Sequence, residues 1–196
     1  MTATNITTKR DKLLNSALVL FSENGIHSSS TASIAKHAGV ANGTLFHHFE
    51  NKQTLIESLY VSIKHELSQS VLLTPEHQAL SIKQQAQLLW NMSIDWGVNN
   101  PAAFIFCQQV TAENILPLSL RLAAMKQELS ILETMIIAGQ QQDYIAKYPM
   151  DLMLEQCQSQ IIGSGLFFIN NPLISSDIIY RQSAFDMFWR AITTDE

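Results

Sequence analysis

Residues 30–49 read STASIAKHAGVANGTLFHHF, in which a glycine separates two short helical patterns. Ser30 is the best N-cap candidate for the first helix, with the hydroxyl residue on either side as an alternative, because a side-chain oxygen there accepts a hydrogen bond from the first turn. Gly39 supplies a tight turn, and a second helix is predicted over about residues 42–49. A capped helix, a tight turn and a short second helix with an exposed face indicate a helix-turn-helix.

The apolar residues of this stretch predict one packed face. The residues expected to point inward are Ile34, Ala35, Val40, Leu45 and Phe49. They would pack against a preceding amphipathic helix through Leu14, Leu18 and Phe21. The exposed side of the second helix then holds Asn42, Gly43, Thr44, Phe46, His47 and His48. Short polar side chains there can approach base edges, while hydroxyls, imidazoles and lysines can reach phosphates.

At these positions the sequence resembles the DNA-binding domain of TetR-type transcriptional regulators. The matching pattern is Ile34-Ala35-x-x-Ala38-Gly39-Val40-x-x-Gly43-Thr44-Leu45-Phe46-x-His48-Phe49-x-x-Lys52, preceded by Phe21-x-x-x-Gly25. It covers roughly residues 10–60, and this density of matched positions makes it highly specific. The resemblance implies a homodimer that binds a near-palindromic operator in double-stranded DNA, usually as a repressor. It also implies release by a small apolar or amphipathic inducer bound in the larger C-terminal domain.

The resemblance implies a role for each residue near the bases. Gly43 and Thr44 match positions beside base edges and the adjacent phosphate, and Asn42 matches the variable position that reads sequence. Phe46 and His47 match aromatic contacts. Because Phe46 stands where the family most often has tyrosine, apolar contact with a thymine methyl group is expected in place of a hydroxyl contact with phosphate.

The resemblance also implies contacts with the DNA backbone. His48 matches a phosphate-contacting position, and Lys52 matches the phosphate-binding lysine that opens the fourth helix. Ser30 is assigned to the same interface. Ala41 stands where a serine or a similar polar residue is common, so no cap or phosphate contact is assigned to that position.

Several of these residues also have a plainer structural interpretation. Phe46 could be buried, since its neighbours at 45 and 49 face inward. His47 could simply be exposed to solvent, and Lys52 could be an ordinary surface lysine. Lys9 and Arg10 could form an arm toward the DNA backbone or a disordered tail.

Composition is compatible with a DNA-binding protein only because the charge is unevenly distributed. The 196 residues carry a net charge of −5, and an acidic chain usually argues against nucleic-acid binding. Residues 1–66, however, hold six Lys or Arg against five Asp or Glu, and five of the six histidines. No apolar run approaches the about 20 residues that a membrane span needs, and the two cysteines are far apart. A cytoplasmic, reduced protein without a membrane partner is therefore expected.

Prolines divide the rest of the chain into helical segments. The expected helices cover about 52–71, 78–98, 101–112, 118–140, 149–169 and 174–192. The predicted fold is thus all-α with about nine helices. We expect a helix-turn-helix DNA-binding domain over residues 1–50 and a helical ligand-binding and dimerisation domain over residues 51–196.

Two further sites are expected in the larger domain. Candidates for the wall of a ligand pocket are Trp90, Trp96, Phe104, Cys107 and Met125, with Asp95, Gln108, Gln109, Thr111 and Glu113 as possible polar partners. Candidates for a dimer interface are Gly163, Phe167, Phe185, Phe188 and Trp189, and the resemblance implies a four-helix bundle there. Burial of these residues within one subunit is the alternative.

Other classes of function have less support. The sequence holds no H-E-x-x-H metal motif, no phosphate-binding glycine loop and no recognisable nucleophile motif, so an enzyme is not expected, nor a metal or cofactor. The adjacent His47 and His48 diverge by about 100° on a helix and cannot easily share one ion. A helical interaction module without DNA binding is the remaining alternative.

Overall fold

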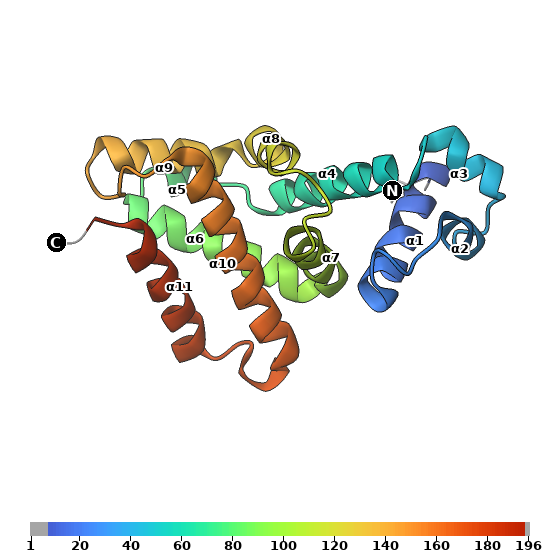
Figure 1. The fold of residues 1–196 in the computed structure, drawn as a ribbon. Coiled ribbons are helices and arrows are strands. Elements are labelled where there is room, and N and C mark those ends of the chain that lie inside the picture. Colours follow the sequence, from blue (N-terminus) through green and yellow to red (C-terminus); the bar gives the residue numbers. More distant parts are fainter. Residues whose placement is uncertain (1–7, 195–196) are drawn as a thin grey trace, which may run out of the picture.

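The computed structural model describes residues 8–194, whose fold is all-α as predicted (Figure 1). The helices are α1 (Lys9–Asn24), α2 (Thr31–His37), α3 (Asn42–His48), α4 (Lys52–Ser70), α5 (Pro75–Gln78), α6 (Ile82–Asn99), α7 (Pro101–Ala112), α8 (Leu118–Glu128), α9 (Ser130–Gln141), α10 (Met150–Asn170) and α11 (Ile178–Ile192). A 3₁₀ turn, η1 (Pro172–Ile174), precedes α11. Between residues 8 and 194 there is no strand, only an isolated bridge between Ile145 and Thr193.

The helices form two unequal groups (Figure 1). Helices α1–α3 gather at one end, and α4 leads from them into a larger helical body that contains α5–α11. Helices α10 and α11 lie side by side at one edge of this body. No helix in the described part of the chain has the length and apolar content to cross a membrane.

The described part of the chain, residues 8–194, forms eleven α-helices, slightly more than the roughly nine predicted. One extra helix is α5, which begins at Pro75 and is capped by Thr74, whose hydroxyl accepts a hydrogen bond from the His77 amide. The other arises because the helix predicted over 118–140 is interrupted at Leu129, whose φ of −118° and ψ of 39° are not helical. Neither proline nor glycine marks that break, so the apolar period continues through it.

Local signals define the N-terminal helices as the sequence indicates. Gly25 and Gly39 have φ of 86° and 68°, in the left-handed region that favours glycine, so the predicted turn at Gly39 is confirmed. The buried residues of this group include Leu13, Leu14, Ala17, Phe21, Ile34, Ala35, Leu45 and Phe49. Helices α1, α2 and α3 therefore pack through the predicted apolar face.

In the larger body, α7 lies against α6 and α10 through Phe104. A Cβ atom added at Gly97 of α6 or at Gly165 of α10 would overlap the Phe104 ring. Glycine at both positions is what lets the three helices approach so closely. Gly165 thus permits close approach to a ring of its own subunit.

Candidate functional site

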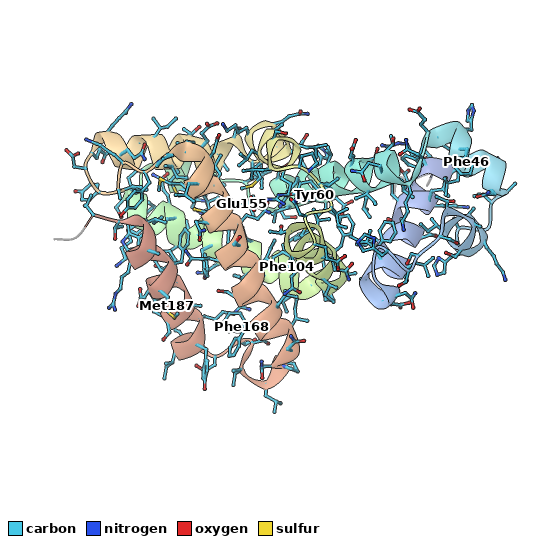
Figure 2. The ribbon with its side chains drawn as sticks, viewed as in Figure 1. Phe46, Tyr60, Phe104, Glu155, Phe168 and Met187 are labelled. Carbon is cyan, nitrogen blue, oxygen red and sulfur yellow. The ribbon has the colours of Figure 1, made fainter. Side chains whose placement is uncertain are left out.

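Helix α3 presents a polar and aromatic face to solvent. Its residues Asn42, Gly43, Phe46, His47 and His48 are exposed, and Thr44 is half-buried. Phe46 is 47% exposed, so the interpretation that it is buried is wrong. Figure 2 shows it at the end of the molecule away from Phe104 and the larger body. The inward residues of the same helix region are fully buried, and this fixes the orientation of α3.

The two helices of the motif begin differently. Ser30 caps α2, because its Oγ accepts a hydrogen bond from the Ser33 amide at 3.0 Å. This confirms the predicted cap. Ala41 occupies the N-cap of α3 and has no side-chain oxygen to accept such a bond. The first turn of α3 therefore lacks the stabilisation that the first turn of α2 has.

The two histidines of α3 lie side by side on its exposed end. The rings of His47 and His48 are 5.3 Å apart and meet edge to face. Across residues 8–194, no three His, Cys, Asp or Glu side chains are grouped so as to hold a metal ion. Both imidazoles remain available to solvent or to a polar partner.

Lys52 is the first residue of α4, as predicted, but its side chain is not free. The Nζ atom donates hydrogen bonds to the backbone carbonyls of Ile26 at 2.5 Å and His27 at 3.4 Å. It also lies 5.8 Å from the centroid of the Phe21 ring. Partial burial lowers the pKa of the Lys52 ammonium group. Lys52 thus ties the start of α4 to the loop between α1 and α2, which its position in the sequence does not reveal.

The basic residues at the start of α1 are neither an arm nor a disordered tail. Lys9 and Arg10 form the first turn of α1, which Thr8 and Asp11 close with reciprocal capping hydrogen bonds. The guanidinium carbon of Arg10 lies 5.4 Å from the centroid of the Phe49 ring. Arg10 therefore packs over the end of α3.

The N-terminal part of this arrangement matches known regulators. Residues 13–59 match the family model for bacterial regulatory proteins of the tetR family. The chain is 46% identical to the HTH-type transcriptional regulator UidR of Escherichia coli K12 over 50 residues. Those 50 residues make up 26% of each protein. Over 51 residues it is 35% identical to the HTH-type transcriptional repressor KstR2 of Rhodococcus jostii RHA1, 26% of this chain and 25% of that one. These matches span about a quarter of the relatives' length.

A solved structure extends the similarity to the whole chain. It is a tetR family transcription regulator from Shewanella sp. PV-4, 33% identical, with a TM-score of 0.87 and coverage of 96% of this chain and 100% of that one. The chain belongs to the TetR family. It is therefore a TetR-family transcriptional regulator with a helix-turn-helix for DNA binding.

The larger body of this TetR-family chain contains an apolar cavity. Its volume is about 60 Å³, which corresponds to about two water molecules at about 30 Å³ each. The five residues expected to line a pocket all line it: Trp90, Trp96, Phe104, Cys107 and Met125. Their contact with a ligand stays a prediction. The polar partners were misplaced: none of Asp95, Gln108, Gln109, Thr111 and Glu113 lines this cavity.

The polar side chains of the cavity wall are Lys64, Ser93 and Gln158, none of which is among the residues predicted from the sequence. Lys64 and Gln158 are each 4% exposed. A signal for Lys64 does exist, because Tyr60, Ile63, Lys64 and Leu67 share the i, i+3, i+4 and i+7 spacing of one buried helix face. A lysine on such a face is unusual, since lysines are almost never fully buried unless paired.

The expected interface residues divide into two groups. Phe185 and Phe188 were assigned to a dimer interface and are instead buried within the subunit, where Phe188 stacks on Trp90 with ring centroids 4.6 Å apart. This corrects their assignment. Trp189 is half-buried and stacks on Phe185 at 6.0 Å. The regular spacing of these aromatic residues shows a shared helix face but not the partner of that face.

Gly163 and Phe167 do lie on the surface, together with part of α11. Phe167 is 45% exposed and stacks on Tyr180 of α11, with ring centroids 6.2 Å apart. Met187, labelled on α11 in Figure 2, is 73% exposed. We call the following exposed residues the α10–α11 face: Leu152, Gln156, Ser159, Gly163, Phe167, Tyr180, Ser183 and Met187.

Proposed function

We propose that this TetR-family regulator binds a near-palindromic operator as a homodimer, acts as a repressor, and is released by a small apolar or amphipathic molecule. The observation that carries the proposal is the orientation of α3, whose buried Leu45 leaves Asn42, Phe46 and His48 exposed. KstR2 is named a transcriptional repressor, and this supports repression over activation. We assign DNA binding to residues 1–50 and ligand binding and dimerisation to residues 51–196.

The α3 face fits the entry of a recognition helix into the major groove. In helix-turn-helix proteins the N-terminal residues of that helix contact base edges. Asn42, Gly43 and Thr44 occupy these positions and are small enough for close approach. We assign apolar contact with a base to Phe46 and an aromatic contact with the DNA to His47. Contact with phosphate is assigned to Ser30, His48 and Lys52.

The α10–α11 face supports a dimer. Its large apolar side chains, Phe167 and Met187, are exposed at 45% and 73% in one subunit. A second copy of the same face would cover them and form a four-helix bundle. A twofold arrangement then presents two α3 helices, which must lie about 34–36 Å apart to enter successive major grooves.

The cavity supports control by a ligand. Its walls include α4, which carries Lys52 at its start, and α7, which packs against α1. A ligand larger than the cavity must move these walls, so it binds a displaced arrangement of the helices more tightly. Only such a difference in affinity can shift the protein away from DNA. Because an operator-binding protein acts where the DNA is, we assign it to the cytoplasm.

The test is a titration of DNA duplexes from the region upstream of the protein's own gene, followed by fluorescence anisotropy. We expect one duplex to bind with an affinity that falls as salt rises and that exceeds the affinity for a shuffled duplex by about a thousandfold or more. Asn42→Ala should change the preference at one operator position, by about 1–3 kcal/mol if the contact is bidentate. Equal affinity for specific and shuffled duplexes would contradict sequence-specific operator binding.

A further inference from the structure

The cavity wall contains a buried lysine without a carboxylate partner. Lys64 is 4% exposed, and its Nζ lies 5.0 Å from the centroid of the Tyr60 ring. Among the described residues, no carboxylate oxygen lies within 4.0 Å of this nitrogen. A buried ammonium group is costly unless an opposite charge balances it.

The surrounding buried charges leave an excess of one positive charge. Arg121 is 6% exposed and pairs with Glu155, with Nη2 and Oε1 2.7 Å apart. Glu155 also interacts electrostatically with Lys64, and Figure 2 shows it on α10. Two cations therefore share one carboxylate. Of the three groups, only Lys64 lines the cavity.

The other titratable groups beside Lys64 do not supply the missing negative charge. Burial raises the pKa of the Tyr60 hydroxyl and the pKa of the Cys107 thiol. Both groups are therefore neutral near pH 7. The excess positive charge at the cavity wall has no balancing partner in this cluster.

The same wall offers hydrogen-bond donors. The amide oxygen of Gln158 accepts a hydrogen bond from the Tyr60 hydroxyl at 3.0 Å, which fixes the amide group. The Gln158 Nε2 is buried and has no acceptor anywhere in the described chain. The indole Nε1 of Trp90, on the same cavity, is likewise buried without an acceptor in residues 8–194. Unpaired buried donors favour a ligand that brings an acceptor oxygen.

We propose that the cavity binds an amphipathic monocarboxylate, with its carboxylate on Lys64 and Gln158 and its apolar part against the aromatic and methionine side chains. This rests on the proposed ligand control and narrows the ligand to an organic acid. A carboxylate forms charge-assisted hydrogen bonds to an ammonium group and also accepts from an amide. A neutral apolar molecule would leave the Gln158 amide donor unpaired and the excess positive charge unbalanced, and a cation would be repelled.

The cavity volume restricts the size of the acid. About 60 Å³ accommodates a compact apolar group without rearrangement, and longer chains must displace the walls. Met125 and Met135 line the cavity and are flexible enough to yield. We therefore choose hexanoate, octanoate and decanoate as probes, each paired with the primary alcohol of the same chain length.

The experiment measures binding of each pair to the full-length protein without DNA, by calorimetry and by quenching of tryptophan fluorescence. We expect at least one acid to bind about tenfold or more tightly than its alcohol. Lys64→Met should remove this advantage and leave the alcohol's affinity unchanged. Lys83→Met, at an exposed position of α6, is the matched control and should keep it. Equal affinity of acid and alcohol for the unmodified protein would overturn the proposal.

Lys64→Met and a second variant, Gln158→Leu, separate binding from folding. Lys64→Met removes a buried charge, so its melting temperature without ligand should equal or exceed that of the unmodified protein. Gln158→Leu should weaken acid binding severalfold without weakening alcohol binding. Unchanged acid affinity in both folded variants would overturn the assigned contacts. Because these titrations contain no DNA, their failure is distinct from a failure of operator binding.

Discussion

The ring of Phe21 in α1 stacks on the ring of Phe106 in α7, with centroids 5.9 Å apart and planes inclined by 14°. Both rings are fully buried. Phe106 lies between Phe104 and Cys107, which line the cavity, so α7 contacts the cavity and the DNA-binding helices at once. Gln109 of α7 adds a second contact between α7 and α1, because its side chain donates a hydrogen bond to the Phe21 carbonyl at 3.1 Å. A displaced α7 must therefore move or strain α1.

Phe106→Leu should weaken this coupling more than it weakens binding at either site. We expect a ligand to bind nearly as before while its effect on operator affinity falls by about 0.5–2 kcal/mol. The measurement is operator affinity with and without a bound ligand. Phe185→Leu is the matched control, because Phe185 is equally buried but packs on Trp90. An identical loss of coupling in both variants would mean that the Phe21–Phe106 contact has no special part.

The two N-caps of the motif should respond in opposite directions. Ser30→Ala removes the acceptor for the Ser33 amide and should lower the free energy of unfolding by about 1 kcal/mol. Ala41→Ser adds an acceptor at the start of α3 and should raise it by about 0.5–1 kcal/mol. Urea denaturation followed by circular dichroism measures both. A destabilised Ala41→Ser variant would show that the α3 N-terminus cannot accommodate a capping hydroxyl.

Lys52→Met should affect both folding and DNA affinity. The loss of two hydrogen bonds to the α1–α2 loop should lower stability by about 1–3 kcal/mol. If the ammonium group also reaches phosphate, affinity should fall alike for all sequences, and the slope against salt should decrease by about one. Anisotropy titrations over a range of salt concentrations measure this slope. A lower affinity with an unchanged slope would restrict Lys52 to its role between α4 and the loop.

Met187→Asp should yield a folded monomer. The side chain is 73% exposed, so the substitution costs little within one subunit, whereas in the proposed dimer it would bury an unpaired charge. Light scattering with size-exclusion chromatography measures the mass. Leu72→Asp is the control, since Leu72 is 62% exposed and lies outside the α10–α11 face. A monomeric unmodified protein at micromolar concentration would contradict the dimer itself.

Sequence signals were sufficient where they were local. The Ser30 cap, the Gly39 turn and the inward spacing of Leu45 and Phe49 depend on neighbouring residues, and the structure has them as predicted. The break at Leu129 is not marked by any proline or glycine in the adjoining sequence, so the local signals do not reveal it.

The helical spacing of apolar residues does not predict which residues pack against them in the folded protein. The spacing of Phe185 and Phe188 identifies a common face but cannot tell a neighbour in the same subunit from a second chain. Their packing partner Trp90 lies about 95 residues earlier in the sequence. The inward position of Lys64 was readable from its helix face, whereas its proximity to Gln158 depends on the contact of α4 with α10 through Tyr60.

The contact of Phe104 with two glycines constrains how this protein can diverge. Because a Cβ at position 97 or 165 would occupy the space of the ring, replacing either glycine alone requires the Phe104 ring to shift. The three positions should therefore covary among full-length homologues: an alanine or larger residue at 97 or 165 should accompany a smaller residue at 104. Such a change would also reshape the cavity, since Phe104 forms part of its wall. At these positions we therefore expect helix spacing and the shape of the cavity wall to change together.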